Sequence, residues 1–313
     1  MRLSFLLSLV LVTSVNAAPP TTQSTRFLRY IEFPDGSAQL QAADAAYKNG
    51  DGVVVHLIAA VHIADHAFYA GLDESFDHYD ALLYEMVKPR APATAPAEIA
   101  TTLPTETGTP KARTTKTAPT KPAPQPNLRW VGGMQRFLRD HLKLEYQLDG
   151  IDYDDRPNFV HADLDAQSFA EMQAERGETM LSLMLRSAMA NANKTNSDTT
   201  GLALLGALFS PDQAREIKRV LAQQFADLDE AMDAMEGPNG SVIVTERNKV
   251  ALRVLREQIK EGKKYIGIFY GAGHLKRMEA ALEDQGFRKV GETWRVAWEI
   301  GPPIALPTTK PAR

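Results

Sequence analysis

The sequence predicts an α/β fold with an α+β tendency, in which a mixed central β-sheet is flanked by helices. Compact apolar runs rich in β-branched and aromatic residues read as buried strands at 53–58, 81–85 and 265–270, and segments with helical periodicity separate them. The strand–helix–strand order of the first half favours parallel strands joined by a crossover helix. The last two predicted strands, 287–290 and 293–300, are expected to form an antiparallel pair.

The first seventeen residues read as a cleaved signal peptide. Arg2 is followed by an apolar run of about ten residues, the length of a signal-peptide core and too short to cross a membrane. Small residues at Val15 and Ala17 predict cleavage after Ala17, or alternatively after Ala18. We therefore expect an exported protein, periplasmic or secreted, without a transmembrane span. Because the chain has no cysteine, a metal site would have to use His, Asp and Glu.

The folded part is expected to be one domain made of residues 18–88 and 128–300. Asp65 is the expected N-cap of the first helix, and Glu85 ends the strand that follows it. In the first part of this domain the sequence predicts strands 26–33, 53–58 and 81–85 and a helix over 64–79.

A Pro/Ala/Thr-rich insertion at 89–127 interrupts the domain. Large apolar side chains are nearly absent from it, so it is expected to be disordered, as is the Pro-rich tail at 301–313. The insertion is basic although the net charge of the chain is −4, so the folded body is acidic, which argues against nucleic-acid binding. The insertion is interpreted as an inert loop or, alternatively, as a weak contact with an anionic envelope polymer or membrane surface.

Helices dominate the second half of the chain. The Met-, Leu- and Ala-rich stretch 178–209 is interpreted as a helical hairpin, or alternatively as an apolar lid over a peptide groove. Asp163 is the expected cap of the helix that begins at 164. The elements expected here are helices 132–142, 164–176, 211–235, 242–260 and 275–285, strands 158–161 and 265–270, and a sharp turn over 271–273.

Three side chains suited to metal binding or acid–base chemistry follow predicted strands. His62, Glu85 and His274 each lie at the carboxyl end of a strand, where ligands of open α/β sheets bind. Two imidazoles and a carboxylate are a common set for a catalytic divalent metal. The same groups suit metal-free hydrolysis with one histidine as the base. The residues alone leave both interpretations open.

The turns before the two histidines belong to the same candidate site. His62 follows a turn that starts at Ala59, and His274 follows Gly271 and Gly273. Glycine tolerates positive φ and allows another group to approach the backbone closely. No phosphate-binding loop, dinucleotide fingerprint or Gly-x-Ser-x-Gly motif is present. The additional candidate site residues are His161, Asp163 and Tyr270.

These motifs resemble those of the TraB/PrgY–Tiki–GumN family, in the wider superfamily with erythromycin esterase and the ChaN-like proteins. The segment from Gly271 to His274 matches the second Gly-x-x-His motif of that family. His62 and Glu85 match its first histidine and its glutamate, and Arg247 matches its helical arginine. The resemblance covers residues 50–90 and 240–300. The first motif departs from the family because alanine replaces its glycine at position 59.

The resemblance implies a Tiki-like fold and a metal-dependent, peptidase-like hydrolase. His62 and His274 would be metal ligands, Glu85 a ligand or general base, and Arg247 the group that stabilises an oxyanion or holds a substrate carboxylate. The metals implied are Mn²⁺, Co²⁺ or Zn²⁺, and the substrate a peptide or a small amide or ester. The alternatives are a non-catalytic protein that sequesters a peptide or signal, and a metal-free esterase-like hydrolase. Without the resemblance, Arg247 reads as a surface ion pair with Glu246 or Asp233.

Overall fold

A computed structural model of the chain describes residues 21–89, 142–154, 156–179, 182, 196–225, 229, 232–233, 236 and 240–302. The strands are β1 (Thr21–Ser24), β2 (Leu28–Glu32), β3 (Ala38–Lys48), β4 (Val54–Ala60), β5 (Ile63–Ala64), β6 (Ala81–Tyr84), β7 (Glu145–Tyr146), β8 (Phe159–His161), β9 (Tyr265–Gly271) and β10 (Arg288–Ile300). The helices are α1 (His66–Phe76), α3 (Gln147–Gly150), α4 (Ala166–Arg176), α6 (Asn196–Leu208), α7 (Gln213–Phe225), the π-helix η1 (Val242–Glu246), α9 (Arg247–Lys260) and α10 (Ala272–Asp284).

Several expectations fall outside the described residues. These are the signal peptide at 1–17 and nearly all of the insertion at 89–127, the helix at 132–142 and the tail at 301–313. The described parts of the two predicted helical segments 178–209 and 211–235 include α6 and α7. The remaining expected elements can be compared with the structure directly.

The mixed sheet that the sequence predicts is confirmed. Its strand order is β1-β2-β3-β4-β9-β6-β8, and β10 pairs with β3. The strands β4, β9, β6 and β8 are parallel neighbours, whereas β1, β2, β3 and β10 pair antiparallel. Parallel strands are covered on both faces, which explains why β9 is buried continuously from Ile266 to its end. The carboxyl ends of the four parallel strands lie at the same edge of the sheet.

The sequence analysis misses β3, the strand that joins the two halves of the sheet. Its eleven residues include five alanines, which favour helices and give little apolar–polar alternation. Pairing decides its structure: β2 pairs with residues 38–42, β4 pairs with residues 44–48, and β10 runs along the whole strand. This tertiary constraint overrides the local preference.

β10 corrects the prediction of two paired strands at 287–290 and 293–300. Residues 288–300 form one strand antiparallel to β3. Gly291 lies at one of two register shifts in this pairing, so it forms a bulge where a turn was expected. Because β3 offers a partner along its full length, the chain continues beyond the glycine and does not fold back on itself.

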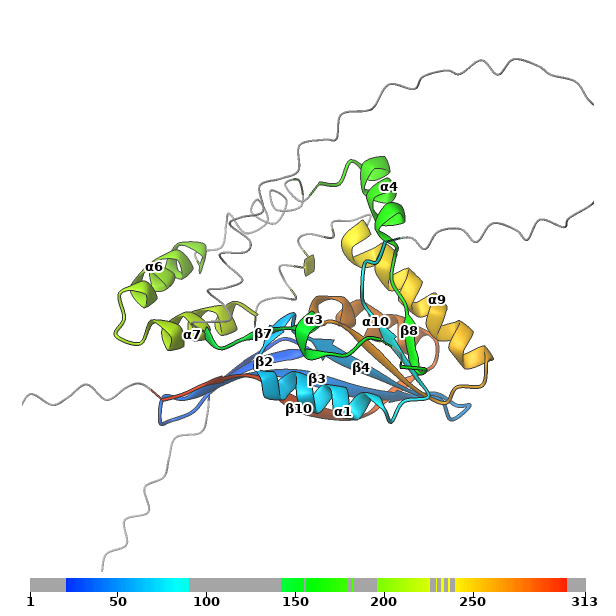
Figure 1. Cartoon of the computed structure of the whole chain (residues 1–313), viewed down its shortest axis with the longest axis horizontal. Coiled ribbons are helices and arrows are strands. Elements are labelled where there is room, and N and C mark those ends of the chain that lie inside the picture. The colour runs from blue at the N-terminus through cyan, green and yellow to red at the C-terminus, as the bar shows by residue number, and fades with distance from the viewer. Residues whose placement is uncertain are drawn as a thin grey trace, which may run out of the picture.

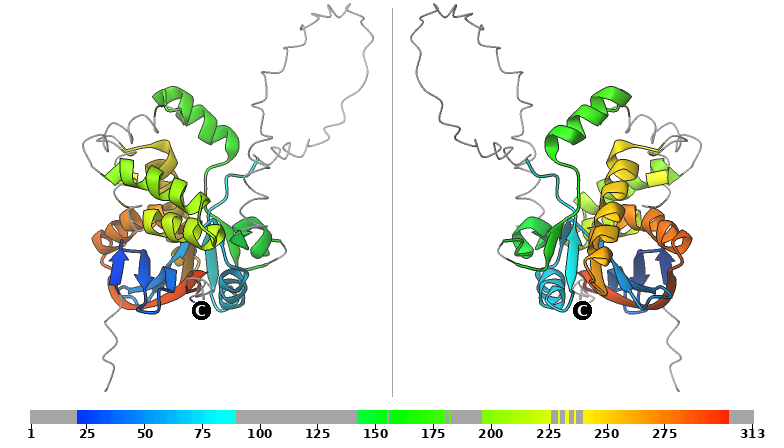
Figure 2. Two further views of the ribbon diagram at one scale, coloured as in Figure 1. Left: turned by 90° about the vertical axis from the view of Figure 1, so that its left-hand side faces the viewer. Right: turned by 90° about the vertical axis from the view of Figure 1, so that its right-hand side faces the viewer.

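Helices cover the sheet, as Figure 1 shows. Figure 2 shows α1 on one side of the strands and α10 on the other. The crossover helix α1 joins the parallel strands β4 and β6 and buries Phe68, Tyr69, Leu72 and Phe76. In the described ranges, no helix has the length and apolar content that a membrane crossing requires.

The helix predicted at 164–176 is confirmed as α4, but its cap is a different residue. Oδ1 of Asp165 accepts a hydrogen bond of 2.9 Å from the backbone N–H of Ser168, which identifies Asp165 as the N-cap. The helix ends at Gly177, whose φ is 61°. Asp163 therefore does not cap α4, and its side chain points into the protein.

A glycine in the central strand gives a test of the sheet packing. A β-carbon on Gly267 would lie 2.7 Å from Leu82 Cδ1 and 3.2 Å from Ile58 Cδ1, both fully buried. We expect Gly267→Ala to lower the free energy of unfolding by about 1–3 kcal/mol through overpacking. Urea unfolding measures it, with Gly291→Ala as the matched control, since a β-carbon there meets nothing within 4 Å. Equal stability of the two variants would contradict this packing.

Candidate functional site

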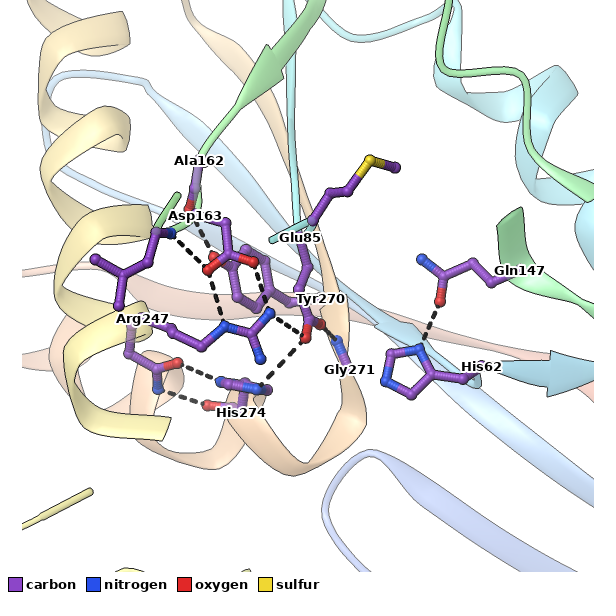
Figure 3. A network of polar contacts seen from close by, with 12 residues as sticks. His62, Glu85, Gln147, Ala162, Asp163, Arg247, Tyr270, Gly271 and His274 are labelled. Carbon is purple, nitrogen blue, oxygen red and sulfur yellow. Dashed lines mark hydrogen bonds and ion pairs between the residues drawn. The ribbon is translucent and has the colours of Figure 1, made fainter. Parts of the chain in front are cut away.

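The ends of the parallel strands bring the predicted site residues together, as Figure 3 shows. His62 comes just after β4, Glu85 directly after β6, and Asp163 two residues after β8. Gly271 is the last residue of β9 and lies between them. The backbone N–H of Glu85 donates to the carbonyl of Phe269 at 3.2 Å, which carries the pairing of β6 with β9 up to the site. Groups distant in sequence are thus neighbours.

Gly271 marks the point on which the three predicted side chains converge. A β-carbon built on it would lie 3.1 Å from Glu85 Oε2, 3.4 Å from His62 Nε2 and 3.6 Å from His274 Cδ2. The two imidazoles and the carboxylate therefore converge on the small space beside Gly271 that a side chain at position 271 would occupy. The close approach expected of this glycine is confirmed.

The backbone of the two turns differs from the expectation. Gly271 has φ −48° and ψ 132° and caps α10, so His274 lies in the first turn of that helix. Neither Gly271 nor Gly273 has a positive φ. A β-carbon on Gly273 would lie 2.7 Å from Met232 Cγ, so a larger residue there would force this methionine side chain to shift. Ala59 is a buried residue of β4 and not part of a turn, so an ordinary strand conformation suffices there.

Glu85 is a buried carboxylate with both oxygens engaged. Its Oε1 lies 2.7 Å from Arg247 Nη2 and 3.7 Å from His274 Nε2. Its Oε2 accepts a hydrogen bond of 2.5 Å from the backbone N–H of Gly271. Burial raises the pKa of the Glu85 carboxyl, but the neighbouring basic groups and the Gly271 N–H outweigh burial and lower this pKa below its usual value. Glu85 is therefore ionised at neutral pH.

Arg247 supplies the permanent positive charge of the site. Its Nε and Nη2 donate to Oδ1 and Oδ2 of Asp163 at 2.8 and 2.6 Å, which makes a bidentate ion pair. Nη2 also contacts Glu85. Burial alone would lower the pKa of Arg247, but the ion pairs with Asp163 and Glu85 raise it above its usual value. Arg247 is buried, so the alternative of a surface ion pair with Glu246 or Asp233 is wrong.

Arg247 lies at the junction of the π-helix η1 and the helix α9. The sequence predicts one helix over 242–260, whereas its first five residues form η1 and Arg247 begins α9. At the start of η1, Ser241 Oγ accepts from the backbone N–H of Val244 at 3.1 Å and a carboxylate oxygen of Glu178 accepts from that of Val242 at 2.9 Å. π-Helical turns shift the faces of a helix and occur often at functional sites.

His274 is buried and neutral. Its Nδ1 lies 2.7 Å from Asn248 Oδ1, and Asn248 Nδ2 donates to the backbone carbonyl of His274 at 3.0 Å. Burial, opposed by the Glu85 carboxylate, lowers the pKa of His274 to about 4. The ring therefore carries no charge at neutral pH and can accept a hydrogen bond.

His62 is more exposed than His274, and Gln147 holds its ring through Nδ1, the nitrogen that does not face Gly271. The Nδ1 of His62 lies 2.9 Å from Gln147 Oε1, and the backbone N–H of Gln147 donates to the carbonyl of His62 at 3.0 Å. Gln147 Nε2 in turn donates to the hydroxyl of Tyr153 at 2.8 Å. The short pairing of β5 with β7 brings Gln147 to this loop.

Of the additional candidates, Asp163 and Tyr270 belong to the site and His161 does not. The Tyr270 hydroxyl donates to the carbonyl of Ala162 at 2.6 Å, and the Tyr270 ring packs edge-on against His274 with 5.3 Å between centroids. Burial raises the pKa of Tyr270, so its hydroxyl remains protonated. His161 Nε2 lies 2.6 Å from the backbone carbonyl of Met86, so this ring nitrogen is engaged by the backbone and not by the other site residues.

Sequence reasoning missed the roles of Asn248 and Gln147. For Asn248 a signal existed: with Arg247 it occupies the buried face of α9 that continues through Ala251, Val254 and Leu255. A polar side chain at such a position needs a partner inside the protein. Gln147 follows the insertion and lies on a four-residue helix, so the residues around it in the sequence do not indicate that it contacts His62.

The side chains do not fit a metal ion in this arrangement. Among the residues that the structure describes, no three His, Asp or Glu side chains are grouped so as to hold a metal. The physical reason is Glu85: one oxygen faces the Arg247 guanidinium and the other faces the Gly271 N–H. A cation beside Glu85 Oε1 would be repelled by Arg247. We derive no step through a metal ion.

Comparisons of the chain with protein-family models, with curated proteins and with solved structures found no match. The functional argument therefore rests on the chemistry of the site. Around the space beside Gly271 the protein places an ionised carboxylate, two imidazoles and a guanidinium. This combination can accept protons from a small polar molecule and stabilise negative charge next to it.

The ion pairs of Arg247 give a second test, on stability. Arg247→Met leaves two buried carboxylates, Glu85 and Asp163, without their cation, so we expect the free energy of unfolding to fall by about 3–5 kcal/mol. The matched control is Arg253→Met on the same helix, where the exposed arginine pairs with Glu257 at 2.9 Å and removal changes stability by about 0.5 kcal/mol or less. Urea unfolding at pH 7 measures both. A similar effect of the two substitutions would contradict the proposed network.

Proposed function

We propose that this chain is a hydrolase that activates water beside Gly271 and cleaves the bond between the carbonyl carbon and the nitrogen of a peptide or related amide, or the corresponding carbon–oxygen single bond of an ester. The observation that carries the proposal is the convergence of His62, Glu85 and His274 on one small space with Arg247 adjacent. The resemblance to the TraB/PrgY–Tiki–GumN family supports the same reaction class. The apolar run in residues 1–17 supports an exported enzyme.

The acceptor atoms beside Gly271 favour a bound molecule that donates hydrogen bonds. His62 Nε2 and Glu85 Oε2 both lie within 3.4 Å of the β-carbon position of Gly271. A water held there can donate both hydrogens to protein acceptors, which leaves an oxygen lone pair for attack on a carbonyl carbon. His62, the more exposed of the two imidazoles, receives the proton from water in this proposal and returns it to the leaving nitrogen or oxygen as the bond from that atom to the carbonyl carbon breaks. The buried His274 orients the reacting group.

Arg247 is placed to stabilise the charge that develops in the reaction. Attack on a carbonyl moves negative charge to its oxygen, and donors fixed beforehand stabilise that oxyanion. Nε and Nη2 are used by Asp163 and Glu85. Nη1 donates no hydrogen bond to another described residue, so we assign its N–H groups to the substrate oxygen.

A metal-dependent peptidase is the second candidate, and one observation favours it. Metal-ligating histidines are commonly fixed through the ring nitrogen that does not bind the metal, and an amide oxygen contacts Nδ1 of both His62 and His274. This version requires the Glu85 carboxylate to turn away from Arg247. A chelator distinguishes the two candidates.

The experiment measures hydrolysis of a peptide library and of chromogenic esters by the purified mature chain, with and without EDTA. We expect cleavage that survives EDTA. Glu85→Gln and Gly271→Ala are expected to lower kcat/KM by about 10²-fold or more, because the first removes the ionised acceptor and the second fills the space with a methyl group. The matched controls, Glu257→Gln on the exposed face of α9 and Gly291→Ala, are expected to leave kcat/KM unchanged.

Each other result points to a specific alternative. Activity that disappears with EDTA and returns with Mn²⁺, Co²⁺ or Zn²⁺ supports the metal-dependent peptidase and contradicts the metal-free mechanism. Tight peptide binding without turnover of any substrate supports a sequestering protein and contradicts a hydrolase altogether.

A further inference from the structure

In both site histidines the same ring nitrogen faces the same type of partner, although the two residues come from different parts of the chain. In each, the ring Nδ1 faces a side-chain amide oxygen: Asn248 Oδ1 at 2.7 Å for His274, and Gln147 Oε1 at 2.9 Å for His62. Asn248 comes from α9 and Gln147 from the short helix α3, two elements far apart in the sequence. Both amides are buried.

The orientation of the Asn248 amide follows from its second hydrogen bond. Its Nδ2 donates to the backbone carbonyl of His274 at 3.0 Å, and a carbonyl oxygen can only accept. The other end of the amide, which faces the ring, must then be the oxygen. An amide oxygen also only accepts, so Nδ1 of His274 carries the proton.

Gln147 is the corresponding partner of His62. Its Oε1 faces Nδ1 of His62 at 2.9 Å, and its Nε2 donates to the Tyr153 hydroxyl at 2.8 Å, a group that can also donate and so does not orient the amide by itself. Its backbone N–H donates to the carbonyl of His62 at 3.0 Å, so ring and backbone of this histidine are held by one residue. With Oε1 facing the ring, Nδ1 of His62 carries the proton too.

We propose that Asn248 and Gln147 are positioning residues that hold His274 and His62 in the Nδ1–H tautomer, with the unprotonated Nε2 of His62 beside Gly271 and that of His274 facing Glu85 Oε1. The tautomers follow from the directions of the two amides, whereas their catalytic consequence rests on the proposed hydrolase function.

The opposite tautomer would disable the site. With a proton on Nε2, His274 would donate toward Glu85 Oε1, 3.7 Å away, and occupy the carboxylate. His62 would present a donor to the water in place of an acceptor. Both imidazoles would lose the acceptor at Nε2, although every side chain would keep its place.

The test reads the tautomers directly, without a substrate. Long-range ¹H–¹⁵N correlation spectra of histidine-labelled protein at pH 7 distinguish the two neutral tautomers, and His62→Gln and His274→Gln assign the signals. We expect the Nδ1–H form for both histidines. Asn248→Ala is expected to shift only His274 toward the Nε2–H form, and Gln147→Ala to shift only His62. Gln258→Ala, an amide on the far part of α9, is expected to change neither.

Conservative variants separate positioning from a loss of packing. Asn248→Asp and Gln147→Glu keep an oxygen acceptor on Nδ1, so they are expected to keep the Nδ1–H form that the alanine variants lose. On a substrate found for the hydrolase, Asn248→Ala is expected to lower kcat about 10- to 100-fold with little change in KM.

Three results overturn the inference: an Nε2–H form of either histidine in the wild type, unchanged tautomers in the alanine variants, or loss of the Nδ1–H form in the conservative variants. If Asn248→Ala does not fold, the Gln147 variants and Asn248→Asp decide the matter. The expected tautomers in a wild-type chain that hydrolyses no substrate would contradict the proposed function and leave the positioning role intact.

Discussion

The contact between the Glu85 carboxylate and the Arg247 guanidinium is the interaction on which the site depends. Both groups are buried, and an isolated buried charge is strongly unfavourable, so each requires the other. Asp163 holds Arg247 by a second ion pair, and the Gly271 N–H holds the second oxygen of Glu85. The carboxylate is therefore both ionised and fixed, as a group that accepts a hydrogen bond from the reacting water must be.

The sheet explains how these charges come to one place. Parallel strands β4, β9, β6 and β8 end at the same edge, and each delivers one part of the site within two residues of its end. The amides of Asn248 and Gln147 then set the two imidazoles from outside. The strands thus place the side chains, the ion pairs fix their charges, and the amides set the direction of the imidazole lone pairs.

Much of this arrangement could be predicted from the sequence, and the gaps have physical reasons. The central strands were found because their apolar runs are continuous, and His62, Glu85 and His274 were found because they follow such runs. The strand β3 was missed because its alanines carry no strand signal and only its partners on both edges make it a strand. Helix caps and side-chain contacts depend on residues that meet only in the folded chain. The sequence predicts Asp163 as the cap of a helix that Asp165 caps, and it gives no sign that Gln147, which follows an insertion, contacts His62.

The pKa of Glu85 tests the central claim most directly. Carboxyl ¹³C spectra of glutamate-labelled protein, with the Glu85 signal assigned by its loss in Glu85→Gln, give the titration of this one group. The contacts with Arg247 and the Gly271 N–H predict a pKa below the usual value of a glutamate in spite of burial. The stability that this depressed pKa contributes should then be lost as the pH falls through it. A pKa above the usual value would show that burial outweighs the ion pair, and would contradict the account of the site.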